Sequence, residues 1–126
     1  MDNLEIEGSF KNPSVFFDAN AGLLKLEGKS IPERTGEFYQ PLLDWIEEYL
    51  SEDHELTTVD LNLEYCNSSS TRYVLDILEK LEAFSKKGNE VKVLWKYEED
   101  DEDMCDLGES YQESLELNIE LVPISV

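Results

Sequence analysis

The stretch LTTVDLNLEYCNSSS, residues 56–70, contains the pattern that decides the fold. Apolar and polar residues alternate from Val59 to Tyr65, so the odd-numbered side chains share one face, as in a strand with one buried side. Asn67 and the serines at 68–70 follow at once, and such side chains satisfy the free N–H groups at the start of a helix. The stretch therefore predicts a central strand that turns directly into a helix.

The residues after the serines extend this stretch into a strand–helix–strand unit. Val74, Leu78 and Leu81 recur at helical spacing, which predicts that they pack on a sheet. The segment Lys86-Lys87-Gly88 is typical of a helix end, and residues 91–97 alternate as a further strand. Two strands joined by a helix form a parallel pair with a right-handed crossover, which indicates an α/β protein.

An antiparallel hairpin is predicted near the N-terminus. Residues 4–7 form a short alternating run, and residues 14–28 contain two apolar runs around the turn-forming segment Asp18-Ala19-Asn20-Ala21-Gly22. At the other end we expect a short acidic helix and a last strand near 117–122. The sheet is thus expected to be mixed, with helices packed on it.

Helical spacing also runs from Pro32 to Leu50, but Pro41 lies inside it. Proline is tolerated in a first helical turn and disrupts an interior one. We therefore expect the main helix to begin near Gln40, or to kink there, after a short helical or turn segment over 33–39. The residues expected on its apolar side are Phe38, Leu42, Trp45, Ile46 and Tyr49.

Length and charge restrict the class of protein. The 126 residues fit one domain, 1–126, and 30 acidic against 10 basic residues give a net charge of −20. Such a surface repels phosphate backbones and anionic lipids, so we expect no nucleic-acid or membrane partner. The N-terminus has neither the basic start nor the apolar run of a signal peptide, which predicts a cytoplasmic protein.

The titratable residues argue against an enzyme. The chain has one histidine, His54, and two distant cysteines, Cys66 and Cys105, so no nucleophile and base are paired in the sequence. A zinc site would need three such ligands brought together from separate segments. We expect no catalytic residues, no cofactor and no metal site.

The serines Ser68, Ser69 and Ser70 are the most informative candidate site. Hydroxyls at a strand-to-helix junction can act as helix caps, nucleophiles or phosphate acceptors, and an ordinary N-cap is the plainest interpretation. A phosphate there would meet free N–H groups and the positive end of the helix dipole, with Arg72 nearby.

Several segments, taken in order, resemble the SiaC-type regulatory phosphoproteins of bacteria. They are Phe16-Phe17-Asp18, Leu26-Glu27-Gly28-Lys29-Ser30, Phe38-Tyr39-Gln40-Pro41-Leu42, Leu63-Glu64-Tyr65-Cys66-Asn67-Ser68-Ser69-Ser70, Leu75-Asp76-Ile77-Leu78 and residues 95–104. The resemblance covers roughly residues 13–122. It implies a fold like the STAS domains of anti-anti-sigma factors.

The resemblance also implies a function. In this family a cognate Ser/Thr kinase phosphorylates the domain, a PP2C-type phosphatase reverses the modification, and one state binds an effector such as a diguanylate cyclase, which links the switch to cyclic di-GMP and biofilm formation. The family's phosphoacceptor is the threonine of an Asn-Thr-Ser-Ser motif, and Ser68 occupies its position, with Ser69 and Ser70 as fallbacks. Asn67, Ser69, Ser70 and Arg72 are the implied partner-binding residues.

The acidic run Glu98-Glu99-Asp100-Asp101-Glu102-Asp103 is a second candidate. Its carboxylates could attract a hard cation, but it lacks the spaced ligands and central glycine of an EF-hand loop. A solvated loop, a partner-binding surface and a small metal-binding module remain open. An acidic adaptor that is never modified is the alternative to the phosphorylation switch.

Overall fold

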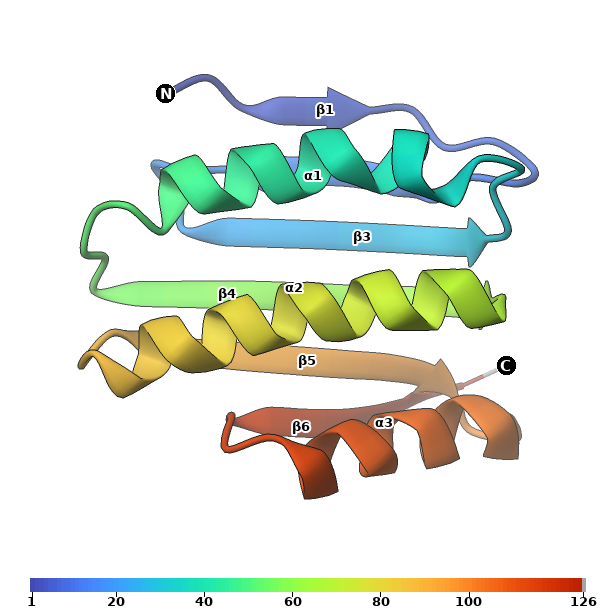
Figure 1. Ribbon diagram of the computed structural model, residues 1–126. Helices are drawn as coiled ribbons and strands as arrows, with labels where there is room; N and C mark the ends of the chain where they lie inside the picture. Colours follow the sequence, from blue (N-terminus) through green and yellow to red (C-terminus); the bar gives the residue numbers. More distant parts are fainter. Residues whose placement is uncertain (126) are drawn as a thin grey trace.

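The computed structural model describes residues 1–125 and consists of six strands and three helices (Figure 1). In chain order these are β1 (Leu4–Ile6), β2 (Ser14–Asp18), β3 (Leu23–Ser30), α1 (Thr35–Tyr49), β4 (Leu56–Cys66), α2 (Ser68–Lys86), β5 (Glu90–Glu98), α3 (Glu102–Ser114) and β6 (Ile119–Ile124). Among the helices of these residues, none combines the length and apolarity that a bilayer-spanning segment requires.

The six strands form one mixed sheet, in the order β1-β2-β3-β4-β5-β6. The β1–β2 and β2–β3 pairs are antiparallel, and the pairs from β3 to β6 are parallel. The predicted N-terminal hairpin, the parallel unit and the α/β class are therefore confirmed. Because β3, β4 and β5 run in the same direction, their carboxyl ends meet at one edge of the sheet.

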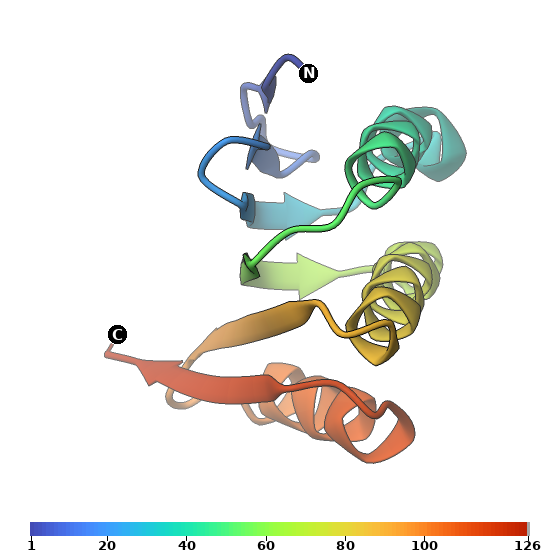
Figure 2. The same ribbon diagram turned by 90° about the vertical axis from the view of Figure 1, so that its left-hand side faces the viewer.

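All three helices cover the same face of the sheet (Figure 2). The side chains that point toward them are buried, as at Leu24 and Leu26 in β3 and at Val93 in β5. The opposite face has no helix over it. Its side chains are half-buried, as at Lys25, or exposed, as at Lys92. This is unusual, because mostly parallel sheets are commonly covered on both faces.

The helix after the serines packs as its sequence predicts. Val74, Leu78 and Leu81 are at most 1% exposed and contribute to the core. The side chain of Asn67 accepts a hydrogen bond from the backbone N–H of Ser70 and caps this helix. The spacing of the apolar residues thus sets the buried face of this helix, and the cap sets its first residue.

The expectation that the first main helix begins near Gln40 is wrong, because α1 begins at Thr35 and contains Pro41. Pro41 is exposed and only six residues into the helix, so water can satisfy the carbonyl that lacks its N–H partner. Burial of the helix face outweighs the defect. That face holds Tyr39 rather than Phe38, which is only half-buried.

Tyr65 also differs from its predicted place. It is 55% exposed, whereas Leu63 is buried beneath the helices. The reason is a β-bulge: Gly28 and Lys29 are consecutive in β3, but they pair with Leu63 and Tyr65 in β4. The extra residue in β4 reverses the direction of the following side chains.

The last helix approaches the sheet closely at Gly108. A Cβ atom there would lie 2.4 Å from Cδ1 of Trp95 and 2.7 Å from Cδ2 of Leu121. The Trp95 indole N–H donates to the carbonyl of Met104, 2.8 Å away, which fixes the ring. The missing side chain therefore allows α3 to lie directly on β5 and β6.

Candidate functional site

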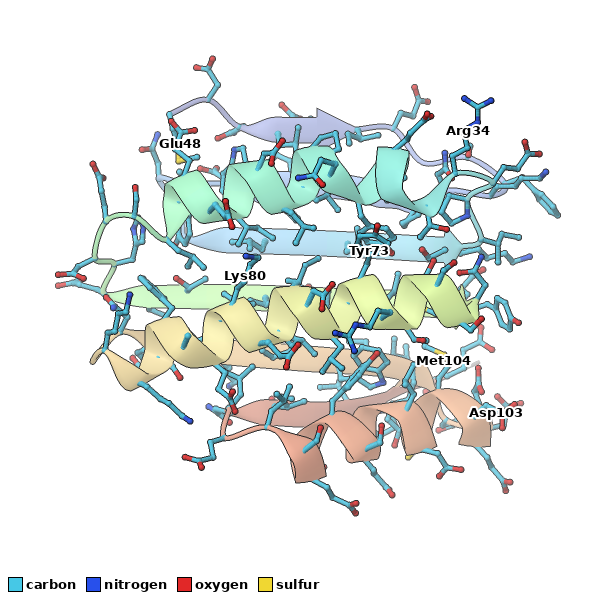
Figure 3. All side chains as sticks on the ribbon, viewed as in Figure 1. Arg34, Glu48, Tyr73, Lys80, Asp103 and Met104 are labelled. Atoms are coloured by element: carbon cyan, nitrogen blue, oxygen red, sulfur yellow. The ribbon has the colours of Figure 1, made fainter. Side chains whose placement is uncertain are left out.

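The serine cluster lies at the edge of the sheet where β3, β4 and β5 end. The helices α1, α2 and α3 all begin at this edge, and Arg34 and Asp103 mark its two sides in Figure 3. In open α/β sheets, binding sites form at the carboxyl ends of the strands. The residues singled out in the sequence therefore share one edge with the loops before α1 and α3.

Ser68 is the first residue of α2 and is exposed. Within residues 1–125 its hydroxyl makes no hydrogen bond, and the helix cap is Asn67 rather than Ser68. The backbone N–H groups of Ser68 and Ser69 lie in the first turn, where a helix provides no acceptor for them. Ser68 therefore combines a free hydroxyl with an electropositive backbone environment.

Ser69 is exposed as well, but its hydroxyl is engaged. It lies 2.9 Å from the hydroxyl of Thr35 and donates to the side-chain oxygen of Asn67 at 3.2 Å. The first turns of α1 and α2 are thus joined through a pair of hydroxyls. Modification of the Ser69 oxygen removes the proton that it donates to Asn67.

Ser70 is fully buried. Its hydroxyl donates to the Ser30 carbonyl at 3.1 Å and accepts from the Ser30 hydroxyl at 2.8 Å. The Tyr39 hydroxyl lies 2.6 Å from that of Ser30 and donates to it, since the single proton of Ser30 is already used. Burial raises the pKa of Tyr39 to about 12, so the phenol keeps the proton that this bond needs. A kinase cannot reach Ser70 while this first turn is folded.

These buried hydroxyls are the part of the site that the sequence did not indicate. Ser30 ends β3 and Tyr39 lies in α1, so the contacts with Ser70 join residues up to 40 positions apart. The only local signal is a serine at the end of an otherwise apolar strand pattern, and that signal is common on surfaces.

Arg72 is exposed, and its guanidinium lies 3.4 Å from the carboxylate of Asp76, one turn further along α2. Residues four apart share one face of a helix, so Arg72 lies on the same face as Ser68. An exposed pair of this length contributes little to stability and is easily exchanged for a stronger partner. Arg72 is therefore available to a doubly charged anion at Ser68.

The acidic run is partly helical. The side chain of Asp101 caps α3 by accepting from the N–H of Met104 at 3.1 Å, and Glu102 and Asp103 lie in the first turn. Acidic side chains are favoured there by the helix dipole. In residues 1–125 no three or more His, Cys, Asp or Glu side chains are placed to hold a metal ion. The hydroxyl of Tyr111 donates to the carbonyl of Thr71 at 2.9 Å and ties α3 to the first turn of α2.

The other candidate side chains have structural places. Burial raises the pKa of the Cys66 thiol to about 12, so it is a neutral, unreactive side chain at the end of β4. His54 stacks on Tyr49 with 3.8 Å between ring centroids. Its Nε2 donates to the carbonyl of Tyr49 at 2.6 Å. Neither residue provides a nucleophile or a base at the serine cluster.

Comparison with known proteins decides the family. Residues 6–124 match the family described as "SiaC family regulatory phosphoprotein". The chain belongs to the SiaC family. An uncharacterised protein of Pseudomonas aeruginosa (strain UCBPP-PA14) is 34% identical to it over 113 residues, which cover 90% of each chain.

Solved structures of the SiaC family match the fold closely. Apo-SiaC from P. aeruginosa superposes with a TM-score of 0.89 at 31% identity, covering 97% of this chain and 99% of that one. A chain in the crystal structure of the diguanylate cyclase SiaD in complex with its activator SiaC matches with a TM-score of 0.91 at 30% identity, covering 96% and 99%. The relationship predicted from the sequence motifs is thereby confirmed.

Proposed function

We propose that this protein is a non-enzymatic switch in the cytoplasm, controlled by reversible phosphorylation of Ser68. A cognate Ser/Thr kinase adds the phosphate, a PP2C-type phosphatase removes it, and an effector of the diguanylate cyclase class binds one of the two states. Membership of a family of regulatory phosphoproteins supports this role. The observation that carries the residue assignment is the difference among the three serines: only Ser68 has an exposed hydroxyl free of internal hydrogen bonds within residues 1–125.

Phosphorylation would act through charge at the edge of the sheet. A phosphoserine adds about −1.5 to −2 charges and three strong acceptor oxygens. The free N–H groups of the first turn and the Arg72 guanidinium would compete for those oxygens, and Arg72 would leave Asp76. Modification is thus compatible with the folded helix, although the chain as a whole has a net charge of −20.

The effector class comes from a relative. SiaC of P. aeruginosa is the activator of the diguanylate cyclase SiaD and forms a complex with it. The present chain has the same fold over almost its whole length, which supports an effector of the same class. A partner with an acidic or apolar contact surface is repelled by the added phosphate, so we propose that the unmodified form binds the cyclase.

The decisive experiment measures phosphate transfer. The purified kinase and isotope-labelled ATP are incubated with the wild type and with Ser68→Ala, Ser69→Ala and Ser70→Ala, and the modified peptide is identified by mass spectrometry. We expect Ser68→Ala to abolish incorporation and Ser69→Ala, its matched control one residue away, to retain it. Ser70→Ala is expected to retain it as well where the variant stays folded.

Binding of the purified cyclase is measured on the same samples before and after phosphorylation. Equal affinity of both states would contradict the switch. Phosphate on Ser69 in the Ser68→Ala variant would overturn the residue assignment and leave the mechanism intact. If no serine of the cluster accepts phosphate, an unmodified acidic adaptor is the better description.

A further inference from the structure

Two exposed aromatic side chains flank one lysine close to Ser68. Of the large apolar side chains in residues 1–125, four are exposed: Met1, Phe10, Leu56 and Tyr65. Phe10, at 76%, lies under Lys29, whose Nζ is 5.0 Å from the centre of the ring. Lys29 pairs across the strands with Tyr65, which precedes Ser68 by three residues. We call Phe10, Lys29 and Tyr65 the aromatic patch.

The backbone is specifically shaped to expose Tyr65. The bulge in β4 turns this ring out of the core, and it occurs opposite Gly28, whose φ of +118° is accessible to glycine and strained for other residues. Without the extra residue, Tyr65 would follow Leu63 beneath the helices. Bulges of this kind commonly re-aim a side chain near a functional site.

The loop between β1 and β2 brings Phe10 to the same place. The N–H of Ile31 donates to the carbonyl of Lys11 at 2.9 Å, which holds this loop against the end of β3 (Figure 1). Phe10 also lines a groove of about 740 Å³, together with Pro32 and Phe38 near the start of α1. Through Phe10 the patch thus adjoins the groove that lies before the start of α1.

Charge indicates what the patch would bind. Eight of the ten lysines and arginines form ion pairs with carboxylates in residues 1–125, and Lys29 and Lys87 do not. Lys29 is therefore an uncompensated cation over the exposed Phe10 ring and opposite Tyr65 on the next strand, in a chain of net charge −20. An apolar side chain would cover the rings, and a neighbouring carboxylate would pair with the ammonium group.

We propose that the aromatic patch anchors the effector protein through a segment in which an apolar side chain lies beside a carboxylate. The inference rests on the proposed function and specifies the surface that reads the switch. A phosphate on Ser68 would repel the carboxylate of this segment. It would also partly neutralise the positive potential of Lys29 that attracts this carboxylate. Binding and modification are then coupled by charge across a few residues.

The test titrates the purified diguanylate cyclase with patch variants and with matched control variants, and calorimetry measures the affinity of each. Phe10→Ala and Tyr65→Ala should each weaken binding about tenfold or more, as for central aromatic anchors, and Lys29→Glu should weaken it at least as much. Leu56→Ala is the control for the rings, because Leu56 is 47% exposed at the opposite end of β4. Lys87→Glu is the control for charge, and both controls should stay within about twofold of the wild type.

Phosphorylation by the kinase provides the second readout on the same variants. It should be unchanged in all of them, which shows that the fold and the phosphosite are intact. If the wild type binds the cyclase and the three patch variants bind it equally well, this inference is overturned and the proposed function stands. A parallel loss of kinase and cyclase recognition would also overturn it, since the patch would then not be specific to the effector. A wild type that neither accepts phosphate nor binds the cyclase would refute the proposed function itself.

Discussion

Ser68 and Ser70 are separated by one residue, yet they differ in every physical respect that matters for modification. Ser68 is exposed and free, while Ser70 is buried between β3 and α1 with its hydroxyl fully used. The alternation arises because Asn67 fixes the first turn of α2 in one orientation. The proposed kinase and the protein core would therefore use different members of the same short motif.

This difference predicts effects on stability of different size. Ser70→Ala should lower the free energy of unfolding by about 1–3 kcal/mol, because it leaves buried groups of Ser30 without their partner. Ser68→Ala should change it by less than about 0.5 kcal/mol, as for an exposed side chain with no contacts. Urea unfolding followed by circular dichroism measures both, and equal midpoints for the two variants would contradict the buried network.

Cys66 predicts a loss of stability at alkaline pH. Its pKa rises from the ordinary value of 9.0 to about 12 through burial, so the native state holds the proton more tightly than the unfolded chain does. The contribution of this thiol to the free energy of unfolding is fully present below about pH 9. It falls as the pH rises toward 12, by up to ~1.4 kcal/mol per pH unit. Tyr39 acts in the same direction between 10.0 and about 12.

The measurement is the urea midpoint at pH 8 and at pH 10.5 for the wild type and for Cys66→Ala. The variant should lose less stability between the two pH values than the wild type does. An identical pH dependence of the two proteins would show that burial of the Cys66 thiol is energetically unimportant.

At the scale of elements, the contact of α3 with the sheet depends on Gly108. Alanine normally stabilises a helix by up to about 1 kcal/mol relative to glycine. Here its methyl group would lie 2.4 Å from Trp95, whose ring is held by its own hydrogen bond. Gly108→Ala should therefore lower the free energy of unfolding by about 1–3 kcal/mol. Glu113→Ala, at an exposed position of the same helix, is the control in thermal melts, and a stabilised Gly108→Ala variant would disprove the close approach.

Most elements could be predicted from the sequence because their signals are local. The alternation in β4, the buried side of α2 and the turn-rich hairpin depend on residues a few positions apart. Pro41 was misleading because the apolar face of α1 gains more by burial than one missing hydrogen bond costs. The exposure of Tyr65 was not predictable, since it depends on how β4 pairs with Gly28 in another strand.

The site was predictable to a similar degree. The serine cluster and its position at a helix start follow from the motif in the sequence. Its internal differences do not, because Thr35, Ser30 and Tyr39 reach it from other elements. Only the folded chain distinguishes the free hydroxyl from the two engaged ones.

The molecule as a whole carries a charge that opposes its own folding. The acidic groups that give the 126 residues a net charge of −20 repel one another most strongly at low ionic strength. The Debye length then reaches tens of ångströms, so charges are poorly screened. The melting temperature should therefore rise by about 3–6 °C between 10 mM and 500 mM NaCl, which corresponds to roughly 1 kcal/mol. Replacing the exposed acids Glu109 and Glu113 by glutamine should reduce this salt dependence, and a melting temperature independent of salt would contradict the repulsion.

The strand order has a consequence for the time course of folding. Every strand pairs with its neighbour in the sequence, so each new strand finds its partner already synthesised when it leaves the ribosome. The sheet can grow in the direction of translation, without waiting for a distant segment. Ser30, Tyr39 and Ser70 all lie in the first 70 residues, so the buried hydroxyls next to the proposed phosphosite can assemble before the last helix is made. The surroundings of Ser68 can thus form before the acidic run, residues 98–103, has been synthesised.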